Sequence, residues 1–408
     1  MNVTSVDVCI VGGGPAGLTL ALALARRGRR VVVLEKAPHF QRSFRGESIS
    51  PDGVWLLDRL GLLEEITAIG ALVTRRLEMT EGGRTAMRVD FDVFPYACPY
   101  PMEIPQPTLL RVLAGAAAQH GGFELRQPAN VTRLVEEGGV VRGVCYLGPE
   151  GPQEVRAELT VGADGRFSKV LAMSGLQHRM LPLARDVVWL RLPCPVEWAG
   201  SYRIALNGSR HAVFVPTYPD SVRVGFNIPK GGLKDLRRQG IGALHARLDE
   251  LAPELSAPLR THISGWKDTS MLDIFTTVVP QWSRPGLVLV GDAAHTLTPI
   301  LGQGVNHALI DGVTLAKLVD GALGTSQPMA AALREFQRIR QGDVAKARRL
   351  QLRQEWMFTF DAPPAVLLRT SIYRAMHRSR LLQRRILGDA YFRLQPPLGR
   401  AASTVPAA

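Results

Sequence analysis

Three glycines near the N-terminus place the strongest constraint on the fold of this chain. Residues 6–36, VDVCIVGGGPAGLTLALALARRGRRVVVLEK, predict a strand, a tight turn, a helix and a second strand, and Gly12, Gly14 and Gly17 give the spacing G-x-G-x-x-G. One glycine forms the turn, one lets a pyrophosphate approach the backbone, and one allows the helix to pack closely on the strand. The chain therefore begins with a βαβ unit of a parallel sheet, whose helix offers free N–H groups to phosphates.

An acidic residue at the end of the second strand narrows the choice of nucleotide. Glu35 follows Gly17 by 18 positions, where a carboxylate accepts hydrogen bonds from both ribose hydroxyls and would repel a 2′-phosphate. The pattern indicates FAD or NAD rather than NADP, and it does not choose between them. The alternative is a glycine-rich turn that binds no ligand.

The composition is that of a globular chain without metal or disulfide chemistry. Its 408 residues are enough for roughly two to three domains, with 46% hydrophobic and 21% charged residues. No apolar stretch approaches the roughly 20 residues that span a bilayer, and no signal segment precedes the first strand, so we expect a cytoplasmic protein. Four dispersed cysteines predict neither a disulfide nor a metal site.

The net charge of +13 is concentrated near the C-terminus. Residues 333–385 mix Arg with Leu, Met and Ile at helical spacing, which predicts an amphipathic helix pair packed on the body with a solvated Arg face. Because no nucleic-acid-binding motif accompanies the charge, we expect no nucleic-acid partner.

Two later strands end in acids and extend the dinucleotide site. The segment LTVGADGRFSKV leads into Asp164 and Gly165, and GLVLVGDAAH leads into Gly291 and Asp292. Acids at the carboxyl ends of strands point into the crevice where α/β sheets bind ligands. An extended dinucleotide with a polyhydroxyl chain needs such acceptors at more than one place, whereas an NAD half-site does not. These segments therefore favour FAD.

Together with the N-terminal loop and FRGESISPDG (44–53), these segments resemble the flavoprotein aromatic hydroxylases, the single-component class A monooxygenases of the para-hydroxybenzoate hydroxylase fold. The resemblance covers about residues 5–345. It implies that the first loop binds the ADP half of FAD, with Glu35 on the adenosine ribose. It also implies that Asp292 holds the ribityl chain, and that Asp164 belongs to an Asp-Gly motif tied to both FAD and the nicotinamide.

The resemblance adds a loop and a helix start beside the flavin. Arg45 matches an Arg of that loop, and Gln106 in PQPTLLRVL stands where the family usually has an Arg, with Arg111 as the expected source of charge. Leu171 replaces an Arg that is common after the Asp-Gly motif. The full set of cofactor-binding candidates is Gly12, Gly14, Pro15, Ala16, Gly17, Glu35, Lys36, Arg45, Gln106, Arg111, Val131, Asp164, Gly165, Gly291, Asp292, Pro299, Gly302, Gln303, Gly304 and Val305.

The segment GDAAHTLTPILGQGVNH (291–307) has two interpretations, a catalytic Asp–His pair or a binding turn between a strand and a helix. The resemblance favours the turn. Pro299 would lie over one edge of the isoalloxazine, and the N–H groups of Gly302, Gln303 and Gly304 would face N1 and the C2 carbonyl. A helix N-terminus there stabilises the negative charge of reduced flavin by about 1 kcal/mol. Pro299 and Gly304 are therefore expected to act in catalysis.

The helix after this turn is predicted over residues 302–323 from an apolar stripe. His295 is expected to position the turn, with proton transfer as the alternative, and His307 is expected to pack on the helix. The stripe consists of Val305, Leu309, Val313, Ala316 and Val319.

Between the second and third flavin segments, short alternating strands separated by Gly, Pro or Asp predict an antiparallel sheet. In VRVGFNI the apolar residues take one face, and Arg223, Gly225 and Asn227 take the other. The resemblance implies that such a sheet covers the flavin and forms the floor of a substrate pocket. For each candidate the alternative is a core position or an outward face. The candidate lining residues are Trp189, Tyr202, His211, Phe214, Arg223 and Asn227, with His211 as the candidate general base.

We therefore expect an α/β fold with three parts. A Rossmann-like FAD-binding domain takes residues 1–75, 102–178 and 272–345, and an inserted antiparallel β-sheet substrate domain takes 76–101 and 179–271. The C-terminal helical segment, 346–408, is expected to close the flavin domain or to mediate self-association, in a monomer or homodimer.

The activity that the resemblance implies is hydroxylation of an aromatic or polycyclic small molecule. NADH or NADPH would reduce FAD, and O₂ would react through a C4a-hydroperoxyflavin in a site that excludes water. Epoxidation and prenyl reduction remain alternatives. A halogenase is disfavoured because no two of the six Trp form Trp-x-Trp. A non-catalytic binder, like the GDP-dissociation inhibitors, is disfavoured because Glu35, Asp164 and Asp292 are all present.

Overall fold

The predicted βαβ unit opens the chain. The computed structural model describes residues 3–40, 47–325 and 328–398. In it β1 (Val3–Val11) and β2 (Val31–Leu34) are parallel neighbours, and α1 (Pro15–Ala25) connects them. α1 is buried on nearly every side because it packs against β2, α4 (Gln106–Ala118) and α10 (Gln303–Asp320). That position accounts for its almost continuous apolar sequence.

An eight-stranded sheet is built around β1. Its centre orders β20, β11, β1, β2 and β8 as parallel strands, so their carboxyl ends meet at one edge. Glu35, Asp164 and Asp292 follow three of these strands, which places the predicted acids at that edge. The bounds are β8 (Phe123–Arg126), β9 (Asn130–Glu137), β10 (Val140–Gly148), β11 (Gly151–Gly162), β19 (Ser283–Arg284) and β20 (Leu287–Leu289).

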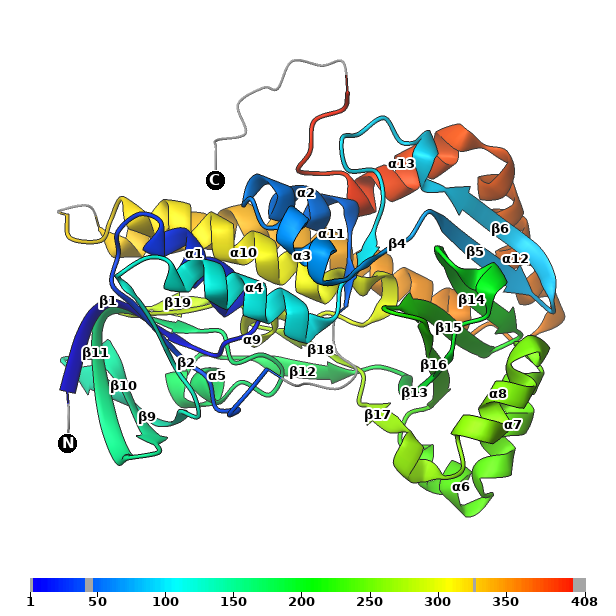
Figure 1. Ribbon diagram of the computed structural model, residues 1–408, viewed down its shortest axis with the longest axis horizontal. Coiled ribbons are helices and arrows are strands. Elements are labelled where there is room, and N and C mark those ends of the chain that lie inside the picture. Colours follow the sequence, from blue (N-terminus) through cyan, green and yellow to red (C-terminus); the bar gives the residue numbers. More distant parts are fainter. Residues whose placement is uncertain (1–2, 41–46, 326–327, 399–408) are drawn as a thin grey trace.

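A seven-stranded sheet forms the other half of the fold (Figure 1). The predicted alternation is confirmed: β13 to β16 bury one set of side chains against three short helices and turn the other set toward a cavity. β5 joins this sheet through a parallel pairing with β14. The strands in order are β17 (Ser270–Leu272), β13 (Arg185–Pro193), β16 (Ser221–Pro229), β15 (Arg210–Thr217), β14 (Ser201–Asn207), β5 (Arg76–Glu81) and β6 (Arg84–Asp90), and the helices are α6 (Leu233–Arg238), α7 (Ile241–Asp249) and α8 (Ser256–His262).

Two small sheets complete the β structure of the described residues. β12 (Arg179–Pro182) pairs with β18 (Phe275–Val278), and β7 (Met102–Glu103) lies between β3 (Ser48–Ile49) and β4 (Leu72–Val73). The further helices are α2 (Pro51–Arg59), α3 (Leu63–Ile69), α5 (Lys169–Ser174) and α9 (Asp292–His295).

Three helices precede the C-terminal end of the described chain: α11 (Met329–Phe358), α12 (Pro363–Arg378) and α13 (Arg380–Tyr391). The first part of α11 packs on α10, whereas α12 and α13 lie over β5 and β6 (Figure 1). The expectation that the C-terminal helices close the flavin domain is therefore wrong for α12 and α13, which close the second sheet. Within the described ranges, no helix is both long enough and apolar enough to cross a membrane.

Two arginines of these helices are buried, which corrects the expectation of a wholly solvated Arg face. Arg340 is 2% exposed, and Arg369 is fully buried. The Arg369 guanidinium pairs with Glu81 of β5 and donates to the carbonyl oxygens of Met357 and Gly208, both at 3.0 Å. A buried charge as well as apolar packing thus attaches α12 to the second sheet.

We expect Arg369→Leu to lower the free energy of unfolding by about 3–5 kcal/mol, because it leaves the Glu81 carboxylate without its partner in a buried site. Arg374→Leu, at an exposed position of the same helix, should change it by no more than about 0.5 kcal/mol. Urea unfolding of the two variants measures this difference, and equal stabilities would contradict the role of Arg369.

Candidate active site

The three glycines of the N-terminal loop have the separate tasks that their spacing predicts. Gly12 has φ +111°, and a Cβ there would lie 2.4 Å from the Ala163 carbonyl oxygen. A Cβ on Gly17 would lie 2.1 Å from the carbonyl oxygen of Gly12. Around Gly14, by contrast, no atom lies within 4 Å of a Cβ position. The first and third glycines are thus required by the packing of the chain, and the second leaves space at the helix start.

Glu35 lies directly against this loop. Its Oε2 accepts a hydrogen bond from the Gly13 N–H and its Oε1 accepts one from the Ala37 N–H, both at 2.9 Å. The side chain is 2% exposed. The carboxylate therefore has a fixed position beside the glycines, where a ribose-binding acid is expected, and Lys36 after it is exposed.

The two other predicted acids differ in their surroundings. Asp164 accepts hydrogen bonds from Ser168 Oγ and from two N–H groups at the start of α5, at 2.7 and 3.1 Å, and burial raises its pKa. It therefore caps α5. Asp292 begins α9, and its Oδ1 lies 3.8 Å from the position of a Cβ on Gly304. Asp292 thus faces the start of α10.

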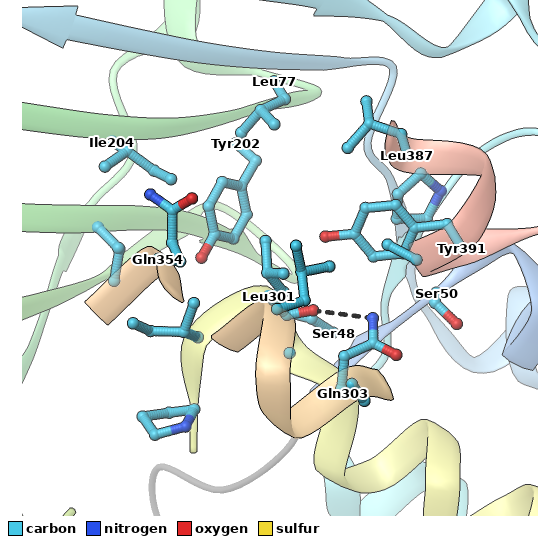
Figure 2. Close-up of a pocket in the computed structure, with 18 of the residues that line it drawn as sticks. Ser48, Ser50, Leu77, Tyr202, Ile204, Leu301, Gln303, Gln354, Leu387 and Tyr391 are labelled. Carbon is cyan, nitrogen blue, oxygen red and sulfur yellow. Dashed lines mark hydrogen bonds between the residues drawn. The ribbon is translucent and has the colours of Figure 1, made fainter. Parts of the chain in front are cut away.

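The backbone reverses sharply between Pro299 and α10. Leu301 and Gly302 adopt left-handed conformations, with φ of 63° and 59°. The side-chain Nε2 of Gln303 donates a hydrogen bond to the Leu301 carbonyl oxygen at 3.2 Å (Figure 2). The turn brings Gly302 and Gln303, at the start of α10, to the cavity side. The predicted stripe is confirmed, with Val305, Leu309, Ala316 and Val319 buried and Val313 half-buried.

An Asp–His pair does exist in the segment 291–307, but its acid lies outside that segment. His295 Nε2 lies 2.7 Å from Asp311 Oδ2 in α10, and the same oxygen accepts the Gly291 N–H at 2.8 Å. The partner of His295 is thus Asp311, which the disfavoured interpretation as a catalytic Asp–His pair did not include. His295 therefore positions the turn between β20 and α10, as predicted.

Arg340 of α11 completes this buried cluster. Its Nε lies 2.7 Å from Asp311 Oδ1, and its Nη2 donates to His307 Nδ1 at 2.8 Å. Although burial opposes ionisation, His295 and Arg340 hold the pKa of Asp311 well below its usual range. Burial, and then Arg340, hold the pKa of His307 well below its ordinary value, so His307 is neutral. The cluster thus keeps one carboxylate ionised in the core.

A cavity of about 490 Å³ lies between this turn, the second sheet and the C-terminal helices. Figure 2 shows Leu301 of the turn, Tyr202 of β14 and Tyr391 of α13 around it. Pro299, Gly302 and other residues of the turn also line it. The volume is typical of a site for a small organic molecule.

Six residues were predicted to line such a pocket, and two of these predictions are wrong. Phe214 faces the opposite side of the sheet, where its ring centroid lies 5.1 Å from that of Trp198. Arg223 lies in a buried ion cluster with Glu47 and Glu103 and is not among the cavity-lining residues. The four that do line the cavity are Trp189, Tyr202, His211 and Asn227, whose contact with a substrate stays a prediction.

His211 is arranged as a donor rather than as a base. Its Nδ1 accepts a hydrogen bond from Arg185 Nη1 at 2.9 Å. Burial, followed by Arg185 and Arg369, holds the pKa of His211 well below its ordinary value. Because Arg185 occupies the lone pair of the neutral ring, Nε2 carries the proton. The role of His211 as a general base stays untested, and this geometry does not favour it.

The remaining cofactor candidates are scattered around the first sheet. Gln106, at the start of α4, is buried, and its Oε1 has no hydrogen-bond partner among the residues that the structure describes. Arg111 is exposed on the same helix, and Val131 is buried in β9. Arg45 lies outside the described residues.

The cavity lining also includes groups that were not predicted, among them Arg185, Glu103 and Tyr391. Arg185 begins β13 and shares the parity of Val187 and Trp189, so the alternating pattern, extended by two residues, indicates it. Glu103 and Tyr391 have no local signal, because segments far apart in the sequence bring them to the cavity.

The edge of the first sheet fits FAD. Gly14 leaves open space at a helix N-terminus, the buried Oε1 of Gln106 lacks a partner, and Asp292 faces the turn before α10. These groups would hold a pyrophosphate, a ring substituent and a polyhydroxyl chain, respectively.

Comparison with known proteins identifies the family. A family model for an FAD-binding domain matches residues 5–329. The chain belongs to this family of FAD-dependent monooxygenases. The 6-methylpretetramide 4-monooxygenase of Streptomyces rimosus is 34% identical over 402 residues, covering 96% of this chain and 94% of that protein. The protoasukamycin 4-monooxygenase of Streptomyces nodosus subsp. asukaensis is 29% identical over 357 residues, covering 85% and 86%.

A solved structure shares the fold. The crystal structure of p-nitrophenol 4-monooxygenase from Pseudomonas putida DLL-E4 has a TM-score of 0.81 at 21% identity, and the match covers 95% of this chain and 98% of that one. The expected fold class, α/β, and the expected FAD-dependent oxidoreductase are thus confirmed. A non-catalytic binding protein is not supported.

The glycine geometry separates ligand binding from folding in this monooxygenase. Gly14→Ala should keep the fold, since the new methyl group meets no atom within 4 Å, but should weaken FAD binding by at least about tenfold by blocking the pyrophosphate. Gly17→Ala should impair folding itself, because its Cβ meets the Gly12 carbonyl oxygen. Gly115→Ala, at an exposed position in α4, is the control. Thermal unfolding and FAD titration measure the two effects, and normal FAD affinity in Gly14→Ala would contradict this site.

Asp311→Asn should lower the free energy of unfolding by about 3–5 kcal/mol, because His295 loses its carboxylate and the buried Arg340 keeps only its half-exposed partner Asp343. Asp320→Asn, the control on the same helix as Asp311, removes a partly exposed ion pair between Asp320 and Arg29. It should lower the free energy of unfolding by no more than about 1 kcal/mol. Because the pKa of Asp311 is lowered by folding, its contribution is complete above about pH 4–5 and is lost as the pH falls below that range. Urea unfolding at several pH values checks both points; a deficit that grows on acidification would contradict them.

Proposed function

We propose that this monooxygenase hydroxylates a phenolic aromatic or polycyclic small molecule in the 490 Å³ cavity, in the cytoplasm, with NADH or NADPH as the reductant. The observation that carries the proposal is the position of the cavity, which reaches from the turn before α10 to the second sheet. The ring system of FAD, held along the first sheet, would then meet the substrate at that turn. The name of p-nitrophenol 4-monooxygenase, which shares the fold, supports a phenolic class of substrate.

When bound, FAD supplies the oxygen chemistry, taking electrons from the nicotinamide and passing one oxygen atom of O₂ to the substrate. The chain itself must orient the substrate and exclude water. Ile204 and Val213 of the second sheet and Leu387 of α13 give the cavity apolar walls. Because α12 and α13 cover the sheet on this side, these walls come from the middle and from the C-terminal part of the chain, and closure of the site depends on their packing.

A buried cationic group, Arg185 at the start of β13, lies on the side of the cavity formed by the second sheet. Arg185 is 6% exposed and lines the cavity, and it donates to His211 Nδ1 and to the Phe358 carbonyl oxygen. Among the described residues no carboxylate forms a salt bridge with it, although Glu355, which also lines the cavity, interacts with it electrostatically. A buried guanidinium without a direct carboxylate partner favours an oxygen-bearing substrate, such as a carbonyl or an anion, beside it.

A purely hydrocarbon substrate, as in epoxidation of a prenyl chain, fits less well. It would leave Arg185 and Glu103 facing apolar atoms, and an unpaired buried polar group is costly. These polar groups of the cavity lining therefore favour hydroxylation of an oxygenated ring.

The proposal is tested by following NADH and NADPH oxidation with the FAD-loaded enzyme across p-nitrophenol, other phenols, polycyclic quinones and prenyl chains, with H₂O₂ trapped and measured. We expect a phenol or polycycle to stimulate oxidation with little peroxide release. Stimulation by prenyl chains alone would overturn the substrate class. Failure of both nicotinamides to reduce the flavin with every compound would overturn the reductant.

Cavity involvement is tested in the same assay with a matched pair of substitutions. Ile204→Trp should fill the cavity and abolish substrate stimulation, while FAD content stays normal. Val196→Trp, at a side chain that is 90% exposed, should leave stimulation unchanged. Full stimulation in Ile204→Trp would place the substrate elsewhere.

A further inference from the structure

Glu103 lies at the end of the cavity nearest the turn before α10. It is the last residue of β7, pairs with Ser48 of β3 and is only 1% exposed, yet it lines the cavity. Ser48 Oγ donates a hydrogen bond to Glu103 Oε2 at 2.7 Å. Ser48 also lines the cavity, and its Cβ lies 3.2 Å from the position of a Cβ on Gly302. The carboxyl group and the serine hydroxyl are therefore adjacent to the turn expected to meet the flavin.

Two carboxyl groups share one guanidinium at this place. Arg223 Nε lies 3.1 Å from Glu47 Oε2, and Arg223 Nη2 lies 3.6 Å from Glu103 Oε2. The Nε hydrogen bond itself goes to Thr217 Oγ1 at 3.1 Å, so neither carboxyl receives a full charge-assisted pair. All three charged side chains are at least 95% buried. With both acids ionised, the cluster would hold an uncompensated negative charge, which favours a proton on one of them.

Burial raises the pKa of Glu103 to about 7, with Glu47 also raising it and Arg223 and Ser48 opposing. The side chains of Tyr202 and Tyr391, which also line the cavity, cannot replace Glu103 as a base. Burial raises the pKa of Tyr202 and of Tyr391 far above neutral, and Glu103 contributes to both shifts. Figure 2 shows both hydroxyls pointing into the cavity, where they have no hydrogen-bond partner among the described residues. Near neutral pH they therefore remain proton donors.

We propose that Glu103 is the proton acceptor of the reaction and takes the phenolic proton of the substrate through Ser48 Oγ. The substrate O–H bond breaks as its proton moves to Ser48 Oγ, and the Ser48 proton moves to Glu103 Oε2. The products are a phenolate, an unchanged serine and a neutral carboxylic acid, so charge and protons balance. The phenolate ring is more electron-rich and accepts an oxygen atom more readily. Tyr202 and Tyr391 then donate hydrogen bonds to the ligand.

This inference rests on the proposed function, because it requires a phenolic substrate. The alternative is that Glu103 only anchors Arg223 and β3 to one another. The two roles differ in a measurable way, since a structural carboxylate leaves the pH dependence of the reaction unchanged, whereas a proton acceptor determines it.

The first test is the pH profile of phenol-stimulated NAD(P)H oxidation by the FAD-loaded enzyme. In the wild type kcat/KM should rise with pH through about 7 and then level off, because Glu103 must be ionised to accept the proton. Glu103→Gln should lower kcat about 10²- to 10⁴-fold and abolish this rise, with FAD content unchanged. Glu103→Asp should restore part of the rate that Glu103→Gln loses. Its kcat/KM should again rise with pH, but with a displaced midpoint. Glu124→Gln, on a half-exposed carboxylate of β8, is the control.

The second test needs no substrate. The infrared carboxylic-acid band of the holoenzyme should titrate near pH 7, and that component should be missing in Glu103→Gln. A pH profile in Glu103→Gln that matches the wild type, or a Glu103 band that does not titrate between pH 5 and 9, would overturn the proposal. If no phenol stimulates the wild-type enzyme, the proposed function fails and the role of Glu103 fails with it. If phenols stimulate the wild-type enzyme and only Glu103→Gln loses the rise of kcat/KM with pH, the proposed function stands and the effect belongs to Glu103.

Discussion

The carboxylate of Asp311 holds together three segments that are far apart in the sequence. One oxygen accepts the N–H of Gly291 and pairs with His295, and the other pairs with Arg340 of α11. Residues 291–295 after β20, helix α10 and the long helix α11 therefore share one buried anion. Because a buried charge is tolerated only with its partners in place, these segments can take only one arrangement. The turn from Pro299 to Gln303 starts from this arrangement, and the cavity forms around that turn.

Alternation in the second sheet provides the other half of the site. The side chains of β13 to β16 that face α7 and α8 form an apolar core, and those of opposite parity face the cavity. Such a face must be covered, and α12 and α13 cover it with Met376 and Leu387. The cavity is thus the space left where the core under the first sheet, the core under the second sheet and the C-terminal helices meet. Some of its polar groups, such as Tyr202 and His211, come from inward positions of this alternation, whereas Glu103 and Tyr391 come from other elements.

Local patterns in the sequence predicted those parts of the molecule that depend on neighbouring residues. The glycine spacing specified the βαβ unit, and the parity of VRVGFNI separated Val224 from Asn227 correctly. Phe214 was misplaced because a single aromatic residue does not show which face of its strand is buried, and only the register with β14 and β16 decides it. Arg340 and Arg369 looked like solvated charges because their acids, Asp311 and Glu81, lie in other elements. Pairings across long sequence separations leave no trace in periodicity.

Burial disfavours the charged form of three groups that line the cavity, Glu103, His211 and Arg185, and this links the packing of the cavity to its chemistry. It raises the pKa of Glu103 and lowers those of His211 and Arg185, because a low-dielectric site disfavours each charged form. His211 is neutral as a result, and Glu103 is brought to the pH range in which it can exchange a proton. Arg185 remains cationic, because its ordinary pKa is so high. The cavity lining therefore includes a permanent cation, Arg185, and a carboxyl group, Glu103, that can change its charge. A phenol with a second oxygen function can hydrogen-bond to both groups, whereas a hydrocarbon can hydrogen-bond to neither.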